Sequence, residues 1–268
     1  MSEILNLKTP ITYYGGKQLM ARHIIPLIPK HTLYCEPFAG GAAIFFAKQP
    51  SEVEVLNDTN RELINFYRVV QGDFVSLEKE IMITLHSRDL HRKASVIYNN
   101  PDMFSELKRA WALWVLAAQG FAGQLDSSWG YDKAKNSTPK KVSNKKKAFT
   151  VDLAVRLQQV QIECADALYI IRSRDTDKSF FYVDPPYFNS DMGHYDGYSK
   201  EDFEALLKLL SGIQGRFILS SYPSDVLSAA TKAHGWHTRA FNAFVSVAAK
   251  SGKHKAKTEV LTVNFALK

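Results

Sequence analysis

The 268-residue chain has only two cysteines, Cys35 and Cys164, and no C-x-x-C pair. This shortage argues against zinc ribbons and dithiol redox sites, which depend on such pairs. A single Cys35–Cys164 disulfide stays open, but nothing in the sequence indicates an oxidising compartment. The sequence also has no metal-ligand cluster and no internal repeat, so we expect neither a metal site nor a repeat architecture.

Long apolar runs are missing as well. No apolar stretch reaches the roughly 18 residues that a membrane helix needs. The N-terminal sequence MSEILNLKTP lacks the basic segment and apolar core of a signal peptide. We therefore expect a cytoplasmic protein without a membrane partner.

The composition is that of a basic globular protein with enough apolar residues for a sizeable core. Hydrophobic residues make up 46% of the chain, and 34 basic residues against 27 acidic ones leave a net charge of +7. A basic protein favours a polyanionic partner, although only weakly, because many basic proteins bind nothing anionic.

The first 61 residues read as a strand, a glycine turn, a buried helix and a second strand. LYCEPFAGG gives the strand 33–35 and the turn with Gly40 and Gly41, AAIFFAK gives the helix, and EVEVLND gives a strand with alternating apolar residues. This order is typical of a βαβ unit.

The middle piece, residues 62–151, has a different character. PDMFSELKRAWALWVLAAQG predicts a helix ending near Gly120. The following segment, to Phe149, is rich in glycine, serine, asparagine and lysine, and we expect a loop with a dense positive charge.

The third piece, residues 152–268, returns to α/β character. ALYII, FFYVD, RFILSS and EVLTVNFAL predict strands, and a helix follows Ser199, which forms a cap with Asp202. The sequence therefore predicts an α/β fold: a Rossmann-like, mostly parallel sheet with helices on both faces, interrupted by an inserted, mainly helical domain.

Two turns are candidates for a cofactor pocket. EPFAGG, residues 36–41, follows a strand, and ligands in open α/β sheets lie beyond the carboxyl ends of strands. Asp58 follows the next strand at about the spacing at which an acid meets ribose hydroxyls. Because the turn is not G-x-G-x-x-G, the ligand is expected to be a nucleoside without a pyrophosphate; a plain tight turn with a solvated Asp58 is the alternative. TYYGGK, residues 12–17, is a second glycine turn ending in a cation.

The stretch FFYVDPPYFN, residues 180–189, is a candidate catalytic site. Asp184 should project from the end of a strand, and Pro185 and Pro186 fix the backbone without continuing a helix. The Asp184 carboxylate and the Pro185 carbonyl can accept both hydrogens of an exocyclic amine, while the Tyr187 ring stacks on a base. A simple proline turn after a buried strand is the competing interpretation.

Taken in order, these motifs resemble the Dam-type (alpha-class) S-adenosylmethionine-dependent DNA adenine-N6 methyltransferases. The resemblance extends over both flanking pieces of the chain. It rests on YYGGK at 13–17, EPFAGGAA at 36–43, NDTN at 57–60, FYVDPPY at 181–187, FILSS at 217–221 and TEVLTVNF at 258–265.

The resemblance implies a catalytic domain of residues 1–61 and 152–268, with a target-recognition domain at 62–151. It implies binding of S-adenosyl-L-methionine, and of double-stranded DNA from which the target adenine is flipped out at a cost of a few kcal/mol. The implied catalytic residues are Asp184, Pro185, Pro186 and Tyr187. The implied cofactor-binding residues are Tyr13, Lys17, Glu36, Phe38, Gly40, Gly41, Asp58, Asp166 and Asp184. We expect no metal and a monomer, located with the nucleoid or in host cytoplasm if phage-encoded.

The basic middle piece supplies the DNA contacts that this resemblance leads us to expect. They are Trp129, Tyr131, Lys140, Lys141, Lys145, Lys146 and Lys147, with the tail 250–257 as a second candidate for phosphate contact. GATC-reading relatives carry a hairpin resembling F-N-G-x-x-R-Y-N-x-x-G-x-F-N-V-P. In this chain, FAGQLDSSWGYD has Asp126 at the position of the arginine that contacts the bases in those relatives, which argues against GATC as the recognition sequence. Cytosine-N4 methylation of DNA and a non-catalytic DNA-binding relative are the alternatives.

Overall fold

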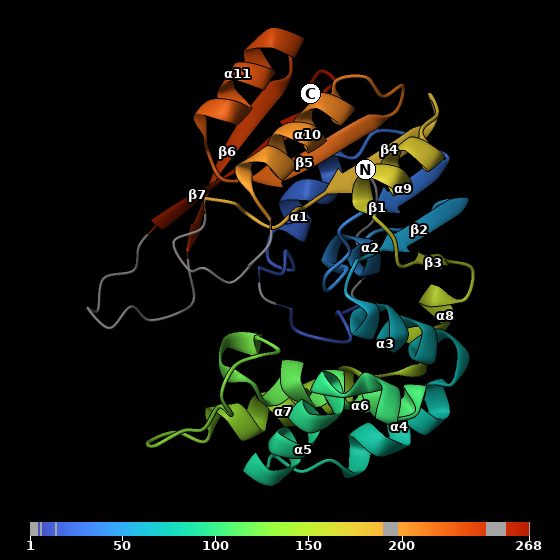
Figure 1. Ribbon diagram of the computed structural model, residues 1–268, viewed down its shortest axis with the longest axis vertical. Coiled ribbons are helices and arrows are strands. Elements are labelled where there is room, and N and C mark those ends of the chain that lie inside the picture. Colours follow the sequence, from blue (N-terminus) through green and yellow to red (C-terminus); the bar gives the residue numbers. More distant parts are fainter. Residues whose placement is uncertain (1–4, 6, 14, 190–197, 245–255, 268) are drawn as a thin grey trace. The chain divides into compact units, whose positions relative to one another are not determined.

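The computed structural model describes residues 5, 7–13, 15–189, 198–244 and 256–267 (Figure 1). The chain divides into two compact units, which are described separately. We call Met1–Pro26, Ala39–Pro50 and Leu56–Cys164 the helical unit, and Leu27–Phe38, Ser51–Val55 and Ala165–Lys268 the sheet unit. The glycine turn thus groups with the helical unit, and the strand before it groups with the sheet unit.

The described residues form one seven-stranded sheet in the order β3-β2-β1-β4-β5-β7-β6. Its strands are β1 (Leu33–Glu36), β2 (Val53–Asn57), β3 (Gln161–Glu163), β4 (Ser179–Val183), β5 (Arg216–Ser221), β6 (His237–Phe244) and β7 (Ala256–Val263). The mixed α/β class expected from the sequence is confirmed.

Parallel pairing joins the three central strands of the sheet unit. β1 pairs with β4, and β4 pairs with β5, which places Cys35 beside Phe181 and Phe181 beside Phe217. β7 then runs antiparallel to both β5 and β6. All five residues of β4 are buried, as expected for a central parallel strand covered on both faces.

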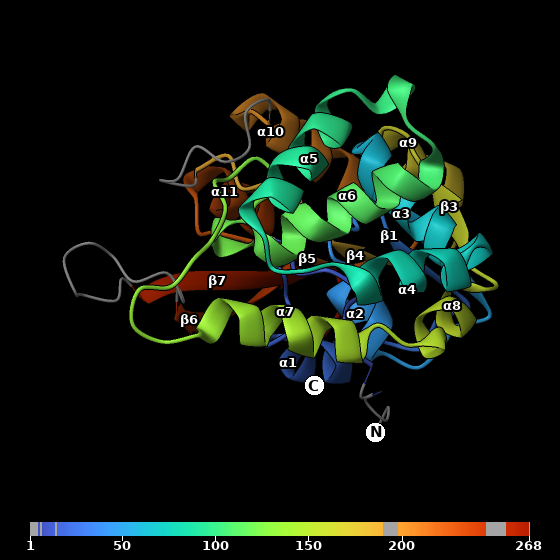
Figure 2. The same ribbon diagram turned by 90° about the horizontal axis from the view of Figure 1, so that it is seen from below.

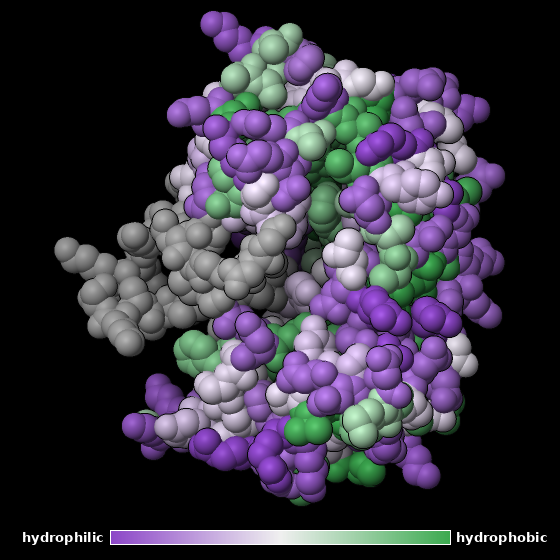
Figure 3. Space-filling model, in the orientation of Figure 1, coloured by the Kyte–Doolittle hydropathy of each residue, from purple (hydrophilic) through white to green (hydrophobic). Residues whose placement is uncertain are grey.

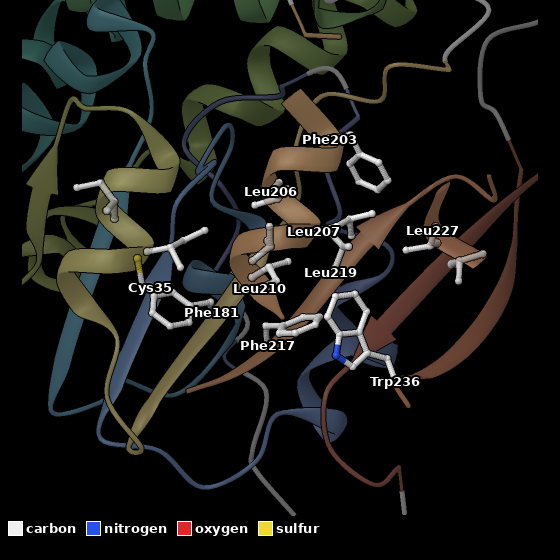
Figure 4. Close-up of a cluster of buried hydrophobic side chains, with 14 of the residues drawn as sticks. Cys35, Phe181, Phe203, Leu206, Leu207, Leu210, Phe217, Leu219, Leu227 and Trp236 are labelled. Atoms are coloured by element: carbon white, nitrogen blue, oxygen red, sulfur yellow. The ribbon is translucent and has the colours of Figure 1, made fainter. Parts of the chain in front are cut away.

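The core of the sheet unit lies between these strands and three helices. The helices are α9 (Ala167–Arg174), α10 (Lys200–Leu210) and α11 (Asp225–His234). Figure 4 shows leucines of α10 lying over strand side chains such as Phe181, Phe217 and Leu219, all fully buried. The position of α10 follows from its sequence: Ser199 and Asp202 form the predicted capping box, and its apolar stripe faces this core.

The helical unit contains most of the other helices of the described residues. They are α1 (Ala21–Ile24), η1 (Ile25–Leu27, which crosses the division), α2 (Ala43–Ala47), α3 (Arg61–Gly72), α4 (Phe74–Ile83), α5 (Arg88–Asn99), η2 (Pro101–Met103), α6 (Glu106–Gln119), η3 (Phe121–Gly123), α7 (Ser137–Ala148) and α8 (Val151–Leu157). α6 is almost wholly buried beyond its first turn, and α7 runs beside it (Figures 1 and 2).

A buried ion pair ties α3 to α6. The Arg109 guanidinium donates to both carboxylate oxygens of Glu62, at 2.8 and 2.6 Å. Such bidentate pairing fixes geometry as well as charge. Glu62 follows Asn60, whose side chain caps α3 by accepting from the Glu62 and Leu63 amides.

Two secondary-structure predictions are wrong. ALYII is not a strand but the start of α9, because the Asp166 side chain caps a helix there by accepting from the Tyr169 amide. The lysine-rich segment is not all loop, since 137–148 forms α7, with Val142 buried at 3% exposure. The strand β6 was not anticipated from its mixed sequence HTRAFNAF.

None of the helices in the described part of the chain has the length and apolar character needed to cross a membrane. In the same residues, no group of three or more histidine, cysteine or acidic side chains is arranged to hold a metal ion. On the face seen in Figure 3, hydrophilic and hydrophobic residues are interspersed over α4 and α5 without forming one apolar patch.

Candidate active site

The glycine turn between β1 and α2 adopts backbone conformations that few residues tolerate. Gly40 has φ +47°, and Ala42, which precedes α2, has φ 49°. A left-handed alanine costs roughly 1–2 kcal/mol, and such residues concentrate where a turn is held for function. Two hydrogen bonds fix the turn. The Ala39 amide donates to the Asn57 carbonyl at 2.8 Å, and the Tyr67 hydroxyl donates to the Gly40 carbonyl at 2.6 Å.

The Tyr13 side chain makes both glycines of this turn necessary. A Cβ on Gly40 would lie 3.2 Å from Tyr13 Cδ1, and one on Gly41 would lie 3.1 Å from Tyr13 Cβ. The TYYGGK and EPFAGG turns, predicted separately, therefore meet in the helical unit. Lys17 is buried, and its ammonium donates to the Gly15 carbonyl at 3.0 Å.

Asp58 supports the glycine turn from the end of β2. Its carboxylate accepts from the Gly40 amide at 3.0 Å and from the Asn60 amide at 2.9 Å. Burial raises the pKa of the Asp58 carboxyl from its usual value, and hydrogen bonds from the Asn60, Gly40 and Thr59 amides oppose that shift. A carboxylate offers about four lone-pair sites, more than these three amides use, so Asp58 can still accept from a further hydroxyl.

A polar cluster surrounds the D-P-P-Y segment in the sheet unit. Asp184 follows β4 directly, and the Tyr187 hydroxyl lies 3.1 Å from its Oδ1. The same hydroxyl lies 2.9 Å from Ser220 Oγ and 3.2 Å from Glu259 Oε1. Burial first, and then the charges of Asp184 and Glu259, raise the pKa of Tyr187 well above its usual value, so the phenol stays protonated. Pro185 is buried and the Tyr222 ring lies 4.4 Å from the Tyr187 ring.

The remaining predicted cofactor residues of the sheet unit have individual surroundings. Glu36 is buried and accepts from the Tyr34 hydroxyl at 2.7 Å. Burial, followed by the charge of Glu36, raises the pKa of Tyr34. Phe38 is half-buried, with the Tyr198 ring edge against it at 6.2 Å. Asp166 is exposed and serves as the N-cap of α9.

Two of the predicted DNA-contacting lysines hold helix ends instead of lying in water. The Lys145 ammonium donates to the Ala117 carbonyl at 2.9 Å, in the last turn of α6, where carbonyls lack partners within the helix. Burial, with a smaller contribution from Lys141, lowers the pKa of Lys145 to about 8. Lys146 donates to the Met82 carbonyl in the last turn of α4 and to the carbonyl of Thr84, the residue after that helix. Their role in the described residues is to join α7 to its neighbours.

The other predicted DNA contacts keep accessible side chains. Lys140, Lys141 and Lys147 are exposed, and so is Tyr131, while Trp129 is half-buried. The tail 250–257 falls largely outside the described residues, which stop at 244 and resume at 256.

Sequence reasoning missed several polar partners of the predicted residues. Ser220 and Glu259 lie within the FILSS and TEVLTVNF motifs, so the signal was present, but nothing in the sequence paired them with Tyr187. Nothing in the sequence indicated that His86 and Arg88 surround Trp129, because they lie before and at the start of α5, far from Trp129 along the chain.

Comparison with known proteins places these motifs in one family. Residues 13–206 match the model of the D12 class N6 adenine-specific DNA methyltransferases. The chain is 27% identical over 282 aligned residues to the type II methyltransferase M1.LlaDCHI of Lactococcus lactis subsp. cremoris, covering 97% of this chain and 96% of that protein.

Two further relatives are longer proteins that share part of this chain. The DNA N-6-adenine-methyltransferase of Escherichia phage P1 is 32% identical over 119 residues, which is 35% of this chain and 15% of that protein. The modification methylase StsI of Streptococcus sanguinis is 23% identical over 204 residues, which is 71% of this chain and 30% of that protein.

A solved structure, the precorrin-6y C5,15-methyltransferase of Geobacter metallireducens GS-15, aligns with 92% of this chain and 85% of its own at 8% identity. Its TM-score of 0.37 makes the likeness too remote to bear on function. The family match extends from the glycine turns through the D-P-P-Y segment into α10. The chain therefore belongs to the D12 class N6 adenine-specific DNA methyltransferase family, and it is an adenine-specific DNA methyltransferase.

Proposed function

We propose that the protein methylates N6 of an adenine within a specific sequence of double-stranded DNA, using Asp184, Pro185, Pro186 and Tyr187 to hold the flipped base. The observation that carries this assignment is the Asp184 carboxylate at the end of β4, only 3.1 Å from the buried Tyr187 hydroxyl. The family shares a general use of S-adenosyl-L-methionine, which supplies an electrophilic methyl group when bound.

The proposed work of the D-P-P-Y segment is to orient a weak nucleophile. The lone pair of an aromatic amine is delocalised into its ring. Hydrogen bonds from both amine hydrogens, to the Asp184 carboxylate and the Pro185 carbonyl, draw the nitrogen toward a tetrahedral geometry and localise that lone pair. Rigidity matters because a displacement of about 1 Å costs around 10²-fold in rate. The prolines and the Tyr187 hydroxyl supply that rigidity.

We further propose that residues of the glycine turn bind the cofactor. In the helical unit, Asp58 would accept from the ribose hydroxyls, with Tyr13, Lys17, Gly40 and Gly41 shaping the turn beside it. The fit rests on the spare acceptor capacity of the Asp58 carboxylate and on the strained, closely packed turn that presents it.

In the sheet unit, Glu36, Phe38, Asp166 and Asp184 are the proposed cofactor contacts. A carboxylate such as Asp166 can accept from the amine of the cofactor adenine with the oxygen that does not cap α9. These roles come from the motif positions and from the chemistry of each side chain.

The proposed DNA interface is the predicted target-recognition segment 62–151. Exposed Lys140, Lys141 and Lys147 would neutralise phosphates, and Trp129 with Tyr131 would contact bases. Lys145 and Lys146 have ammonium groups engaged with backbone carbonyls, so we assign them to the stability of the unit.

A protective role beside a restriction enzyme is supported by the names of two relatives, a type II methyltransferase and a modification methylase. We propose that the protein acts as a monomer in the cytoplasm, where cellular and phage DNA lie.

The test is methylation of unmodified DNA by the purified protein with S-adenosyl-L-methionine, followed by digestion and mass spectrometry of the nucleosides. We expect N6-methyldeoxyadenosine from the wild type. Asp184→Ala should lower turnover at least about 10²-fold while cofactor binding persists. Asp177→Ala removes an exposed acid of the sheet unit and should leave turnover unchanged. Appearance of N4-methyldeoxycytidine would overturn the target base, and an active Asp184→Ala enzyme would overturn the role of Asp184.

A further inference from the structure

A stacked cluster of aromatic and cationic side chains lies in the helical unit, formed by His86, Arg88, Trp129 and Tyr131. We call it the tryptophan cluster. The His86 and Trp129 rings stack with centroids 4.6 Å apart, and the Trp129 and Tyr131 rings stack at 5.8 Å. The Arg88 guanidinium carbon lies 4.8 Å from the centroid of Trp129 and 5.4 Å from that of Tyr131. One cation thus covers two aromatic rings.

The cluster is held in place by Gln119, the fully buried last residue of α6. Its side-chain oxygen accepts from Trp129 Nε1 at 3.2 Å and from the Ser87 amide at 3.0 Å, while its nitrogen donates to the Leu85 carbonyl at 2.9 Å. The Gly130 amide donates to the Gln119 carbonyl at 2.8 Å. His86 Nε2 donates to the Gly130 carbonyl at 3.0 Å, because a carbonyl only accepts. The cluster is therefore preorganised.

Arg88 differs from its neighbour Arg92 on the same helix. Arg92 donates to Asp89 at 3.0 Å, and Asp89 also pairs with Lys93. Among the described residues, no carboxylate lies within ion-pair distance of the exposed Arg88. In the part of the chain that the structure describes, the Arg88 guanidinium lies over the faces of Trp129 and Tyr131. Stacking occupies the face of a guanidinium but leaves the N–H groups along its edge able to donate.

We propose that Arg88 is a specificity-determining residue that reads a guanine in the DNA recognition sequence, with Trp129 and Tyr131 as the platform that aims it. This inference rests on the proposed function, since it requires DNA as substrate. Guanine presents two acceptors, O6 and N7, in the major groove, and their spacing matches two parallel guanidinium donors. A stacked arginine has already lost much of its rotamer freedom, so the contact costs less entropy.

The surroundings of the cluster suit contact with a polyanion. Exposed Lys133 and Lys135 follow Tyr131 after Asp132, and they can contact phosphates. The Asp132 carboxylate accepts from the Ser137 hydroxyl and the Thr138 amide. Asp126 lies in the same loop, after η3, and is also exposed. The Arg88 guanidinium reaches this loop from the start of α5.

The experiment compares Arg88→Lys and Arg88→Ala with the control Arg92→Ala. First, plasmid methylated by wild-type protein is sequenced to map every methylated adenine and its flanking bases. Then kcat/KM is measured for each protein on duplexes that carry the mapped site or a single G·C to A·T change at each position. Melting temperature and S-adenosyl-L-methionine binding are measured for each variant to verify folding.

We expect both Arg88 variants to lose discrimination at one guanine position by about 5- to 140-fold, with the other positions unchanged. Arg88→Lys keeps the charge but not the paired donors, so it should resemble Arg88→Ala. Arg92→Ala should keep the full wild-type preference. A wild-type site without a guanine, or equal weakening on all duplexes with discrimination intact, would refute the proposal and indicate a phosphate contact at most. The absence of methylation by the wild-type protein would instead contradict the proposed function.

Tyr131→Phe and Tyr131→Ala test the platform itself. The phenylalanine variant keeps a ring under Arg88 and should retain the preference for guanine. The alanine variant removes half of the platform and should lose part of that preference while the melting temperature stays near the wild-type value, because Tyr131 is 55% exposed. Retention of full preference by the alanine variant would refute the aiming role of the stack.

Discussion

Replacing Tyr187 with phenylalanine separates two functions that the D-P-P-Y tyrosine combines. The ring is proposed to stack on the target base, and the hydroxyl anchors Asp184 while contacting Ser220 and Glu259. Tyr187→Phe keeps the ring and removes only the hydroxyl. Because a phenol has one proton, it donates to one carboxylate at a time, and the variant leaves both Asp184 and Glu259 without that donor.

The size of the effect follows from the charge of the partners. A hydrogen bond to a charged group contributes about 1.5–3 kcal/mol. If that amount orients Asp184 in the transition state, kcat falls by about 10- to 150-fold. Glu259 is only 9% exposed, so the loss of a donor should also reduce the free energy of unfolding by about 1–3 kcal/mol. The affinity for DNA should change little, since the ring remains.

Single-turnover methylation of a saturating duplex, measured between pH 6 and 9, gives the rate, and urea unfolding gives the stability. The matched control is Tyr198→Phe, whose buried hydroxyl has no hydrogen-bond partner among the described residues, so its removal should be neutral. The raised pKa of Tyr187 keeps the phenol protonated over this range, so the difference between wild type and Tyr187→Phe should not depend on pH. An unchanged rate in Tyr187→Phe would refute the anchoring role of the hydroxyl.

Three further predictions concern the helical unit. The pKa of Lys145 is about 8 in the folded chain against 10.5 for the ordinary side chain, so the unfolded chain binds more protons between these values. The free energy of unfolding should therefore rise with pH in this range by about 3 kcal/mol, whereas urea unfolding of Lys145→Met should lack that rise. Arg109→Met should lower the free energy of unfolding by about 3–5 kcal/mol, because it leaves the buried Glu62 carboxylate without its cation. The double variant Glu62→Gln/Arg109→Met should lose clearly less stability. Equal losses would contradict a penalty for the buried charge. Gly40→Ala should destabilise the chain and weaken cofactor binding measured by calorimetry, because φ of Gly40 is +47° and the added Cβ would contact the Tyr13 ring. The control Gly72→Ala adds a Cβ with no atom within 4 Å and should be neutral or stabilising by up to about 1 kcal/mol. Equal effects of the two substitutions would contradict the conformational requirement for glycine at position 40.

The strands next to the site were predictable because the same short apolar runs that favour a strand locally are also buried in the centre of the sheet. FFYVD and RFILSS are short, apolar and bounded by turn residues, and they form the buried parallel pair β4 and β5. The helix after Ser199 was predictable from its cap and apolar stripe. Motif order along the chain also identified the family, which the match to residues 13–206 confirms.

The errors have equally local causes. ALYII is a five-residue apolar run, and such a run has no period long enough to distinguish a strand from a helix. This run forms a helix because the Asp166 side chain caps α9. The lysine-rich segment was expected to be loop because its composition is polar. In the folded chain, Val142 is buried and Lys145 finds the unpaired carbonyl of Ala117, and these contacts stabilise α7.

The sequence by itself determined the class of fold, the order of the motifs and the residue types at each proposed reacting position. These depend on local pattern and on spacing along the chain. Only the tertiary structure decided which side chains support them. Glu259 contacts Tyr187, which is 72 residues away along the chain, and Arg88 contacts Trp129 from the start of α5. Such pairings arise from the packing of elements distant in sequence, and no local pattern encodes them.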